Sequence, residues 1–373
     1  MKRTSAFFIA LLLCIVSFAQ KSQLRVATYN VDGLPSSLSV VSINPDGPGA
    51  ERSPLMGSKI MEHGWDVVGL NEDFNFHSEL TSTMSDYEFQ THQGKFESSS
   101  TAIMGILAGT YRFPIDGLML ATRKGFTVKG EDMVPWESEA VYGYLTNKQD
   151  SLTMKGFRYY TVSSPEGYSV DFIILHADAG YVHQDRKARE AAMDQLCRYI
   201  EGIKTQNPLI VMGDYNNLYF RDAMKTLFID RLNAMSGLTA SDAWVEKCCA
   251  GEYPAFENPG MDDNKSWDDT GMDLTETSEA VDKIVYVNRD DAPIRLELVS
   301  TANAIDFVDD SGKALGDHMP LEATFSVIPQ GSSDVQTIMG DSLSDAPLYN
   351  IQGLRVTGDY RGLLLKNRKK YIR

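Results

Sequence analysis

The segment "PLIVMGDYNN", residues 208–217, indicates the fold class of this chain. Its four consecutive apolar residues, from Leu209 to Met212, are typical of a strand that is buried on both faces of a sheet. Such strands belong to α/β proteins, in which helices cover the sheet. The apolar run breaks into Asp214, Tyr215, Asn216 and Asn217, so metal-binding and hydrogen-bonding side chains follow directly where the strand ends.

Similar segments recur along the chain. Each is short, rich in β-branched or aromatic residues, and bounded by Gly, Pro, Asn or Asp, which predicts strands. They lie at residues 24–31, 65–72, 117–123, 157–162, 168–178, 280–287 and 319–327. Helical patterns alternate with them, and the clearest covers residues 184–203, where apolar side chains recur at helical spacing. The sequence therefore predicts central sheets that are covered by helices.

The N-terminus has the layout of a secretory signal peptide. Lys2 and Arg3 precede a short apolar run, and Gln20 follows the small residue Ala19. We therefore expect residues 1–19 to be a leader and the protein to be secreted, periplasmic or exposed at the cell surface. No later segment has an uninterrupted apolar stretch of transmembrane length.

Composition, net charge and cysteine content limit what kind of protein this chain can be. A chain of 373 residues with 43% hydrophobic residues can form a sizeable core. The net charge is −16, which opposes adventitious binding to nucleic acids, although a bound cation could reverse the charge locally. Cys197 could form a disulfide with Cys248 or Cys249, or all three could be free thiols. The sequence contains no CxxC motif or Cys/His cluster, which argues against a structural zinc site.

The C-terminal part differs in composition from the body. Residues 329–347 are rich in Ser, Gly and Asp, which predicts a linker after a catalytic domain at residues 20–328. Residues 348–373 form a basic tail that alternates weakly around three glycines and could form a small hairpin or remain an extension. The tail resembles a module found at the C-termini of exported bacterial proteins, which would imply a sorting role.

Nearly every predicted strand ends in a residue that can bind a metal or transfer a proton. Taken singly, these residues have ordinary explanations as turn formers, helix caps or surface acids. Taken together they match the needs of phosphodiester hydrolysis: hard oxygen ligands for a cation, donors to the phosphate, and a base near the attacking water. The candidates are Asn30, Glu72, His176, Asp214, Asn216, Asp282, Asp317 and His318.

Two of these residues stand out on chemical grounds alone. Glu72 is the best single ligand for Mg²⁺ or Ca²⁺, and Asn30 could add a neutral carbonyl oxygen. His318 is the best proton carrier, because an unperturbed histidine titrates near physiological pH. A carboxylate such as Asp282 could orient it.

The ordered motifs resemble those of the endonuclease/exonuclease/phosphatase superfamily, which has the DNase I-like fold. The resemblance covers about residues 24–327 and rests on "TYNVDGLP", "LNEDFN", "ILHAD", "GDYNN", "VDKIVY" and "GDHMPLEA". It implies a four-layered α/β sandwich with two packed central sheets that are flanked by helices.

The same resemblance implies a role for each site residue. Asn30 and Glu72 would bind Mg²⁺, with Ca²⁺ or Mn²⁺ as alternatives, and Asp317 would lie near a second cation or its bound water. The remaining roles are implied in the same way: His176 would donate to the phosphate, Asp214 would orient or activate the water, Asn216 would hold the scissile phosphate, and Asp282 would align His318 as a general base or acid.

Three details resemble the neutral sphingomyelinase-like, phospholipase C-type branch. They are the Asn-Glu pair in "NEDFN", the pair Lys155 and Gly156 before a strand, and the His-Ala pair in "LHAD". A Lys-Gly pair is also common in ordinary turns. The branch implies cleavage of a sphingomyelin-like phospholipid, with transient contact to a membrane surface and no obligate protein partner.

Candidates for that membrane contact are residues 100–114, the pair Tyr142 and Tyr144, and a long loop with Phe256 and Trp267. A buried helix at residues 100–114 and a loop without a role are equally compatible with the pattern. Two alternatives to a lipid diesterase remain open: a DNase-like nuclease on the same fold, and an exported protein that binds ligands without cleaving them.

Overall fold

The computed structural model describes most of the body and short parts of the tail. The described residues are 22–38, 41–97, 99, 113–141, 153–180, 182–255 and 275–330, with tail strands at 335–337, 348–350, 355–356, 363–366 and 369–372. The chain divides into two compact units, Met1–Ile328 and Pro329–Arg373, which we describe separately.

The first sheet of the body has six strands. Its spatial order is β13 (Ile294–Asn303), β14 (Leu321–Pro329), β1 (Ser22–Asn30), β4 (Val67–Asn71), β6 (Met119–Arg123) and β5 (Tyr87–Phe89). β1 pairs in parallel with β4 and antiparallel with β14. The sheet is therefore mixed, and its central strands β1 and β4 run in the same direction.

The second sheet also has six strands and the same kind of centre. Its order is β11 (Leu238–Asp242), β12 (Asp282–Arg289), β10 (Leu209–Asp214), β9 (Ser169–His176), β8 (Gly156–Ser163) and β7 (Thr127–Pro135). β9 and β10 are parallel, and β12 runs antiparallel to β10. Each sheet thus has two parallel central strands beside an antiparallel neighbour.

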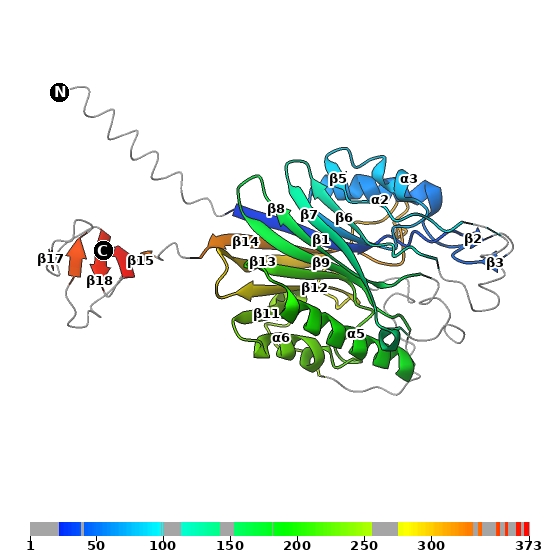
Figure 1. The fold of residues 1–373 in the computed structure, drawn as a ribbon. Helices are drawn as coiled ribbons and strands as arrows, with labels where there is room; N and C mark the ends of the chain where they lie inside the picture. The colour runs from blue at the N-terminus through cyan, green and yellow to red at the C-terminus, as the bar shows by residue number, and fades with distance from the viewer. Residues whose placement is uncertain are drawn as a thin grey trace, which may run out of the picture. The chain divides into compact units, whose positions relative to one another are not determined.

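The two sheets pack face to face, and helices cover their outer faces (Figure 1). Side chains from both sheets form the central core, among them Val26, Leu120, Ile174, Met212 and Phe325. Burial of each such side chain stabilises the fold by about 1.5–3 kcal/mol. The layers are in close contact, because a Cβ atom built on Gly69 would lie 2.9 Å from Met212 Cε of the other sheet.

The outer layers complete a four-layered sandwich, as the family resemblance predicts. Helix α2 (Gly49–His63) packs its buried residues Met56 and Ile60 on the first sheet, beside the short helix α3 (His77–Thr81). Helix α5 (His183–Gly202) packs on the second sheet through Ala192 and Leu196. The remaining short elements are α6 (Asp230–Ala234), α7 (Ala243–Cys248), a 3₁₀ turn at Ser138–Ala140, a π-helical turn at Lys225–Ile229, and the ribbon of β2 (Ser37–Leu38) and β3 (Val41–Ser42).

All eight strands predicted from the sequence are present, and the predicted helix at residues 184–203 is α5. The predicted strands occupy the interior positions of the two sheets. The four strands of these two sheets that the apolar pattern did not reveal, β5, β7, β11 and β13, are the four sheet edges.

The C-terminal unit contains a five-stranded sheet, which is wider than a hairpin. Its order is β15 (Val335–Thr337), β19 (Lys369–Ile372), β18 (Leu363–Lys366), β16 (Leu348–Asn350) and β17 (Arg355–Val356). β15 lies within the segment that the sequence predicts as a linker.

Several expectations concern residues outside the described part of the chain. These are the leader at residues 1–19, most of residues 100–114, and Tyr142, Tyr144, Phe256 and Trp267. Cys197, Cys248 and Cys249 are free thiols, so the disulfide alternative is not realised. Among the helices that are described, none has the length and apolar character needed to cross a bilayer.

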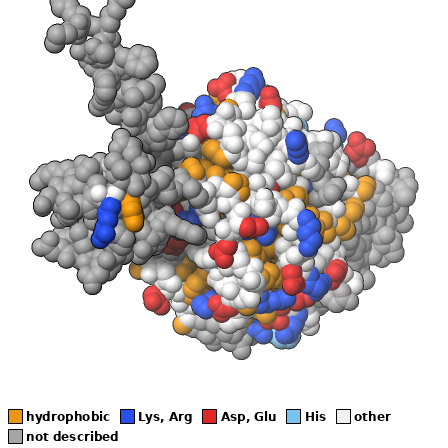
Figure 2. Space-filling model, turned by 60° about the vertical axis from the view of Figure 1, so that its left-hand side comes forward, with side chains coloured by type: hydrophobic (Ala, Val, Ile, Leu, Met, Phe, Trp, Pro, Cys, Tyr) orange, Lys and Arg blue, Asp and Glu red, His pale blue; other side chains and the backbone are white. Residues whose placement is uncertain are grey.

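Exposed large apolar side chains in the described body are scattered along the chain, at Leu55, Val182, Val299 and Ile305. On the face drawn in Figure 2, apolar side chains lie in small groups among acidic and basic ones.

Candidate active site

The ends of six strands from both sheets meet at one edge of the sandwich. β1, β4, β9 and β10 end there, and the antiparallel strands β12 and β14 begin there. The pairing aligns Asn30 with Asn71 in the first sheet, and aligns Asp214 with both His176 and Asp282 in the second. Segments that are far apart in the sequence therefore place their polar ends side by side.

Left-handed backbone conformations direct several of these side chains. Asp32, Glu72 and Asn216 have φ angles of 50°, 55° and 48°, which are uncommon for residues other than glycine. Local hydrogen bonds support two of the turns: the Asn216 N–H donates to Asp214 Oδ1 (2.8 Å), and the Asp32 N–H donates to Asn30 Oδ1 (3.0 Å). Strain at strand ends is common in functional sites.

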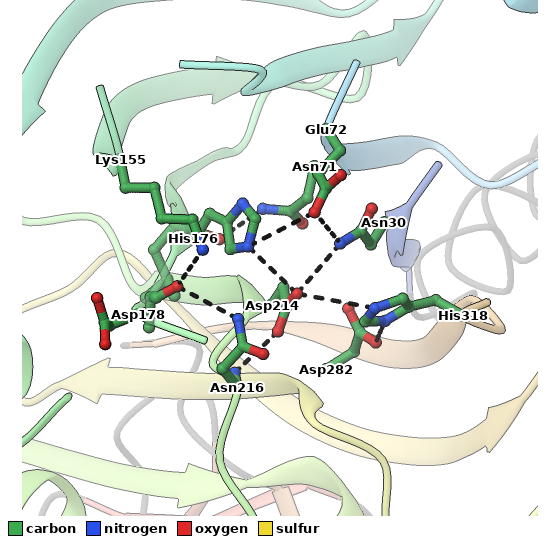
Figure 3. A network of polar contacts seen from close by, with 12 residues as sticks. Asn30, Asn71, Glu72, Lys155, His176, Asp178, Asp214, Asn216, Asp282 and His318 are labelled. Atoms are coloured by element: carbon green, nitrogen blue, oxygen red, sulfur yellow. Dashed lines mark hydrogen bonds and ion pairs between the residues drawn. The ribbon is translucent and has the colours of Figure 1, made fainter. Parts of the chain in front are cut away.

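Asp214 is at the centre of the site (Figure 3). Its Oδ2 lies 3.4 Å from His176 Nε2 and 3.9 Å from His318 Nε2, and it accepts a hydrogen bond from Asn30 Nδ2 at 3.1 Å. Burial alone would raise the pKa of this carboxyl. The two histidines and Lys155 outweigh burial and hold the pKa of Asp214 below its ordinary value, so the buried group is ionised.

His318 is oriented by a second buried acid. Its Nδ1 lies 2.7 Å from Asp282 Oδ2, so Nε2 is the ring nitrogen that faces Asp214. Burial raises the pKa of Asp282 to about 6, and the neighbouring acids act in the same direction, while His318 opposes the rise. The pair thus resembles the acid–histidine arrangement of other proton-transfer sites.

A separate group of acids surrounds Glu72. Burial, followed by the charge of Asp317, raises the pKa of Glu72 to about 7. Burial and the charge of Asp317 also raise the pKa of Asp32 to about 8. Asp317 itself is exposed and acts on both through its charge. These carboxylates carry more negative charge than the nearby cations offset.

This donor set fits a hard divalent cation. Carboxylate oxygens are the ligands that Mg²⁺ and Ca²⁺ prefer, and a cation would relieve the repulsion that raises these pKa values. Asn30 is oriented differently from a simple oxygen ligand. Its Nδ2 faces Glu72 Oε1 at 3.2 Å, and its Oδ1 accepts from the Asp32 N–H. Exchange of the amide oxygen and nitrogen would be needed for Asn30 to present oxygen beside Glu72.

The structure brings Asn30, Glu72, His176, Asp214, Asn216, Asp282 and His318 together, with Asp317 at the exposed margin. Three further residues were absent from the predicted set. The first is Asp32, whose left-handed turn brings its carboxylate close enough to Glu72 for their charges to interact.

Lys155 is the second missed residue. Its buried Nζ donates to the Ala177 carbonyl (3.0 Å), the same oxygen that accepts from Asn216 Nδ2 (3.2 Å), and its charge acts on both Glu72 and Asp214. The third is Asn71, whose Nδ2 donates to the Leu175 carbonyl at 2.6 Å and joins the two sheets beneath the site. For Lys155, the Lys-Gly pair in the sequence was the available indication, but the same pair is common in ordinary turns and did not single out Lys155 as a site residue.

Solved structures with similar folds come from several organisms. Danio rerio TDP2, determined in complex with a single-strand DNA product, superposes with a TM-score of 0.54 and 16% identity over 82% of this chain and 99% of that chain. An endonuclease/exonuclease/phosphatase family protein of Bacteroides thetaiotaomicron gives a TM-score of 0.51 and 17% identity over 83% of this chain and 99% of that chain. The chain has the endonuclease/exonuclease/phosphatase fold.

The chain is also similar in sequence to curated sphingomyelinases. A sphingomyelinase of Mycobacterium tuberculosis (strain ATCC 25618 / H37Rv) is 28% identical over 303 residues, which is 81% of this chain. The Mycobacterium bovis sphingomyelinase matches equally well. The matched region is 52% of the length of these relatives, so the chain spans about half of each. No family model matches the chain. The resemblance indicated by the sequence motifs is thus confirmed.

Proposed function

We propose that this chain is a secreted, divalent-metal-dependent phosphodiesterase. Its substrate is a sphingomyelin-like phospholipid, which it hydrolyses to ceramide, or a related lipid alcohol, and a phosphorylated headgroup. The likeness to mycobacterial sphingomyelinases supports the substrate class. The leader-like sequence at residues 1–19 supports secretion.

One observation carries the proposal: the buried Asp214 carboxylate lies between two histidines and beside an acidic cluster. An ionised carboxylate can accept a hydrogen bond from a water molecule and orient it toward phosphorus. The acidic cluster beside it can hold a cation. Both parts are needed, because a phosphodiester is an anion that resists attack by a nucleophile.

Glu72 would hold the cation, with Asp32, Asp317 and a reoriented Asn30 as the other candidate ligands. Mg²⁺ suits this oxygen-rich set best, and Ca²⁺ or Mn²⁺ are alternatives. When bound, the cation would neutralise phosphate charge and polarise a phosphoryl oxygen.

The protein's own groups divide the remaining tasks. Asp214 orients the attacking water and can accept its proton. His318, held through Nδ1 by Asp282, presents Nε2 for proton transfer. His176 Nε2 lies between Glu72 (3.9 Å) and Asp214 (3.4 Å), where it can donate to a phosphate oxygen. Asn216 and Lys155 lie next to this position and add donors and positive charge for the phosphate.

A parallel substrate assay tests the proposal. Purified protein is incubated with sphingomyelin vesicles, phosphatidylcholine vesicles, phosphoinositides and DNA, each with Mg²⁺ and with EDTA. We expect choline phosphate from sphingomyelin, dependence on Mg²⁺, and loss of activity in E72Q and H318A. A matched control is H183A, because His183 lies on the exposed start of α5. Full metal-dependent activity in E72Q or H318A would contradict the proposal.

The assay also separates the two rivals. Release of acid-soluble nucleotides without choline phosphate would favour a nuclease. The net charge of −16 weighs against strong binding to a polyanion. Binding of phospholipid without turnover, unaffected by chelator, would favour a ligand-binding protein.

A further inference from the structure

A second group of metal-binding side chains lies outside the proposed active site. Asp73, His77 and His92 come from the loop after β4, the first residue of α3 and the segment after β5. One ligand atom from each lies within 4.8 Å of the other two. Figure 1 shows α3 and β5 near one another, and the ring of His77 contacts that of Phe89 on β5.

Both histidines are directed to the same aspartate. His77 Nδ1 lies 2.7 Å from Asp73 Oδ2, and His92 Nε2 lies 3.0 Å from the backbone carbonyl of Asp73. The two imidazole rings stack, with centroids 4.2 Å apart and planes at 13°. The Asp73 side chain is 1% exposed and that of His77 is 21% exposed, so the cluster is open to solvent on the histidine side.

An ion pair between Asp73 and His77 explains only part of this arrangement. It accounts for the short contact between them, and the Asp73 carbonyl accounts for one nitrogen of His92, but neither contact uses the three ligand atoms that lie within 4.8 Å of one another. A cation shared by two ring nitrogens and the carboxylate would use all three ligand atoms at once. Tetrahedral ligation with bonds of about 2.0–2.1 Å places ligand atoms about 3.4 Å apart. Because a metal ion lies in the plane of each imidazole that binds it, the two stacked rings would have to rotate out of their nearly parallel arrangement when the ion binds.

We propose that Asp73, His77 and His92 bind a divalent transition-metal cation of the Zn²⁺ type. Two imidazole nitrogens and one carboxylate suit Zn²⁺ or Co²⁺, whereas the carboxylate-rich group at Glu72 suits Mg²⁺. Three protein ligands leave one position for a water molecule or another ligand. The site needs no cysteine, so the absence of a Cys/His motif in the sequence does not bear on it.

The cation would brace the segment that carries Glu72. Asp73 follows Glu72 directly, and the left-handed conformation of Glu72 marks the point where the chain turns from one site to the other. The Asp73 N–H donates to the Gly117 carbonyl at 3.0 Å, so this segment is already held on one side. The proposal does not depend on the proposed substrate, because its test measures metal binding.

Metal content tests the proposal directly. The chelator-treated full chain is held in excess Mg²⁺ and titrated with Zn²⁺, and bound zinc is counted by mass spectrometry after gel filtration. We expect wild type and the matched H183A control to bind one more equivalent of Zn²⁺ than H77A/H92A. The single H92A variant should bind Zn²⁺ at least about tenfold more weakly. Equal zinc content in wild type and H77A/H92A would overturn the proposal.

A measurement on the wild type guards against variants that fail to fold. Co²⁺ bound at this site should give the intense visible bands of a four-coordinate complex and paramagnetically shifted imidazole signals from two histidines. In H92A, unfolding without metal should match wild type, while stabilisation by Zn²⁺ should be lost. Co²⁺ spectra that show oxygen ligands alone would place the metal elsewhere and would also overturn the proposal.

Discussion

Glu72 and Asp214 are buried carboxylates in one site, yet their surroundings shift their pKa values in opposite directions. Burial raises the pKa of Glu72 to about 7, and a neighbouring acid adds to the effect. Burial acts on Asp214 in the same sense, but two histidines and a lysine reverse it. The comparison teaches that neighbouring charges, rather than burial, divide the site into a half that attracts a cation and a half that keeps its base ionised.

The largest effect on turnover should come from removing the charge of Asp214. We expect D214N to lower kcat by roughly 10³–10⁴-fold, because an amide cannot accept a proton from water. Mg²⁺ binding, measured by calorimetry, should change much less, since the acids around Glu72 remain. A D214N protein that keeps its turnover but loses metal would reverse the roles we assign to the two halves.

A smaller effect is expected from Asp282, which acts through His318. D282N should lower kcat by about 10²-fold, because His318 loses its charged partner but keeps a neighbour of the same size. The pKa of Asp282 is raised to about 6, so the charged form predominates above that pH. Wild-type kcat should therefore fall below about pH 6, and this limb should be absent from the D282N profile. An unchanged limb in D282N would assign it to another group.

The affinity for Mg²⁺ should rise with pH, because the acids around Glu72 must lose protons before they can bind the cation. The pKa of Glu72 is raised to about 7 and that of Asp32 to about 8, so near pH 7 both carry protons part of the time. Because a cation must displace those protons from both groups, the apparent affinity for Mg²⁺ should rise by more than about tenfold from pH 6 to 7. Calorimetry in two buffers with different ionisation enthalpies measures the protons released. E72Q should release fewer, and the same heat in both buffers would contradict the prediction.

His63 and its two acidic partners are partly exposed, so solvent screens their charges more than those of the buried site. His63 Nε2 lies 3.0 Å from Asp306 and its Nδ1 lies 3.4 Å from Glu322. The hydrogen bond to Glu322 raises the pKa of His63. Its stabilisation is therefore complete below the ordinary pKa of about 6.5 and is lost as the pH rises through the higher folded value.

The variant H63F removes the charge of His63 with little change in packing, because an aromatic ring can keep the stacking on Trp65. We expect it to cost less than about 1 kcal/mol of unfolding free energy at pH 5.5, and less still at pH 8.5. Urea unfolding at the two pH values measures the difference. An equal loss at both pH values would mean that packing, and not charge, determines the contribution of His63.

The sequence predicted the interior of the fold better than its edges. Interior strands such as β4 and β10 are buried along their whole length and are therefore apolar runs. Edge strands such as β7 and β13 contain charged residues, including Lys129 and Glu297, so their pattern resembles that of loops. Their place in a sheet depends on a neighbour that is distant in the sequence.

In the site too, some residues are marked by the local sequence and others only by their neighbours in the folded chain. Asp214 and Glu72 follow apolar runs directly, so local sequence marks them. Lys155 and Asp32 act through their charges on residues from other segments, which come close to them only in the folded chain. The cluster of Asp73, His77 and His92 was also invisible, because turns set the distances between its members.

The alignment of Asp214 with His176 on one side and Asp282 on the other has a consequence for refolding. A slip of a single residue in either ladder would turn every side chain of the slipped strand to the opposite face. A misaligned chain could therefore recover its full far-ultraviolet circular dichroism while its catalytic groups point apart. The rate at which turnover returns after dilution from denaturant would then report the correction of strand alignment, which spectroscopy of the backbone does not detect.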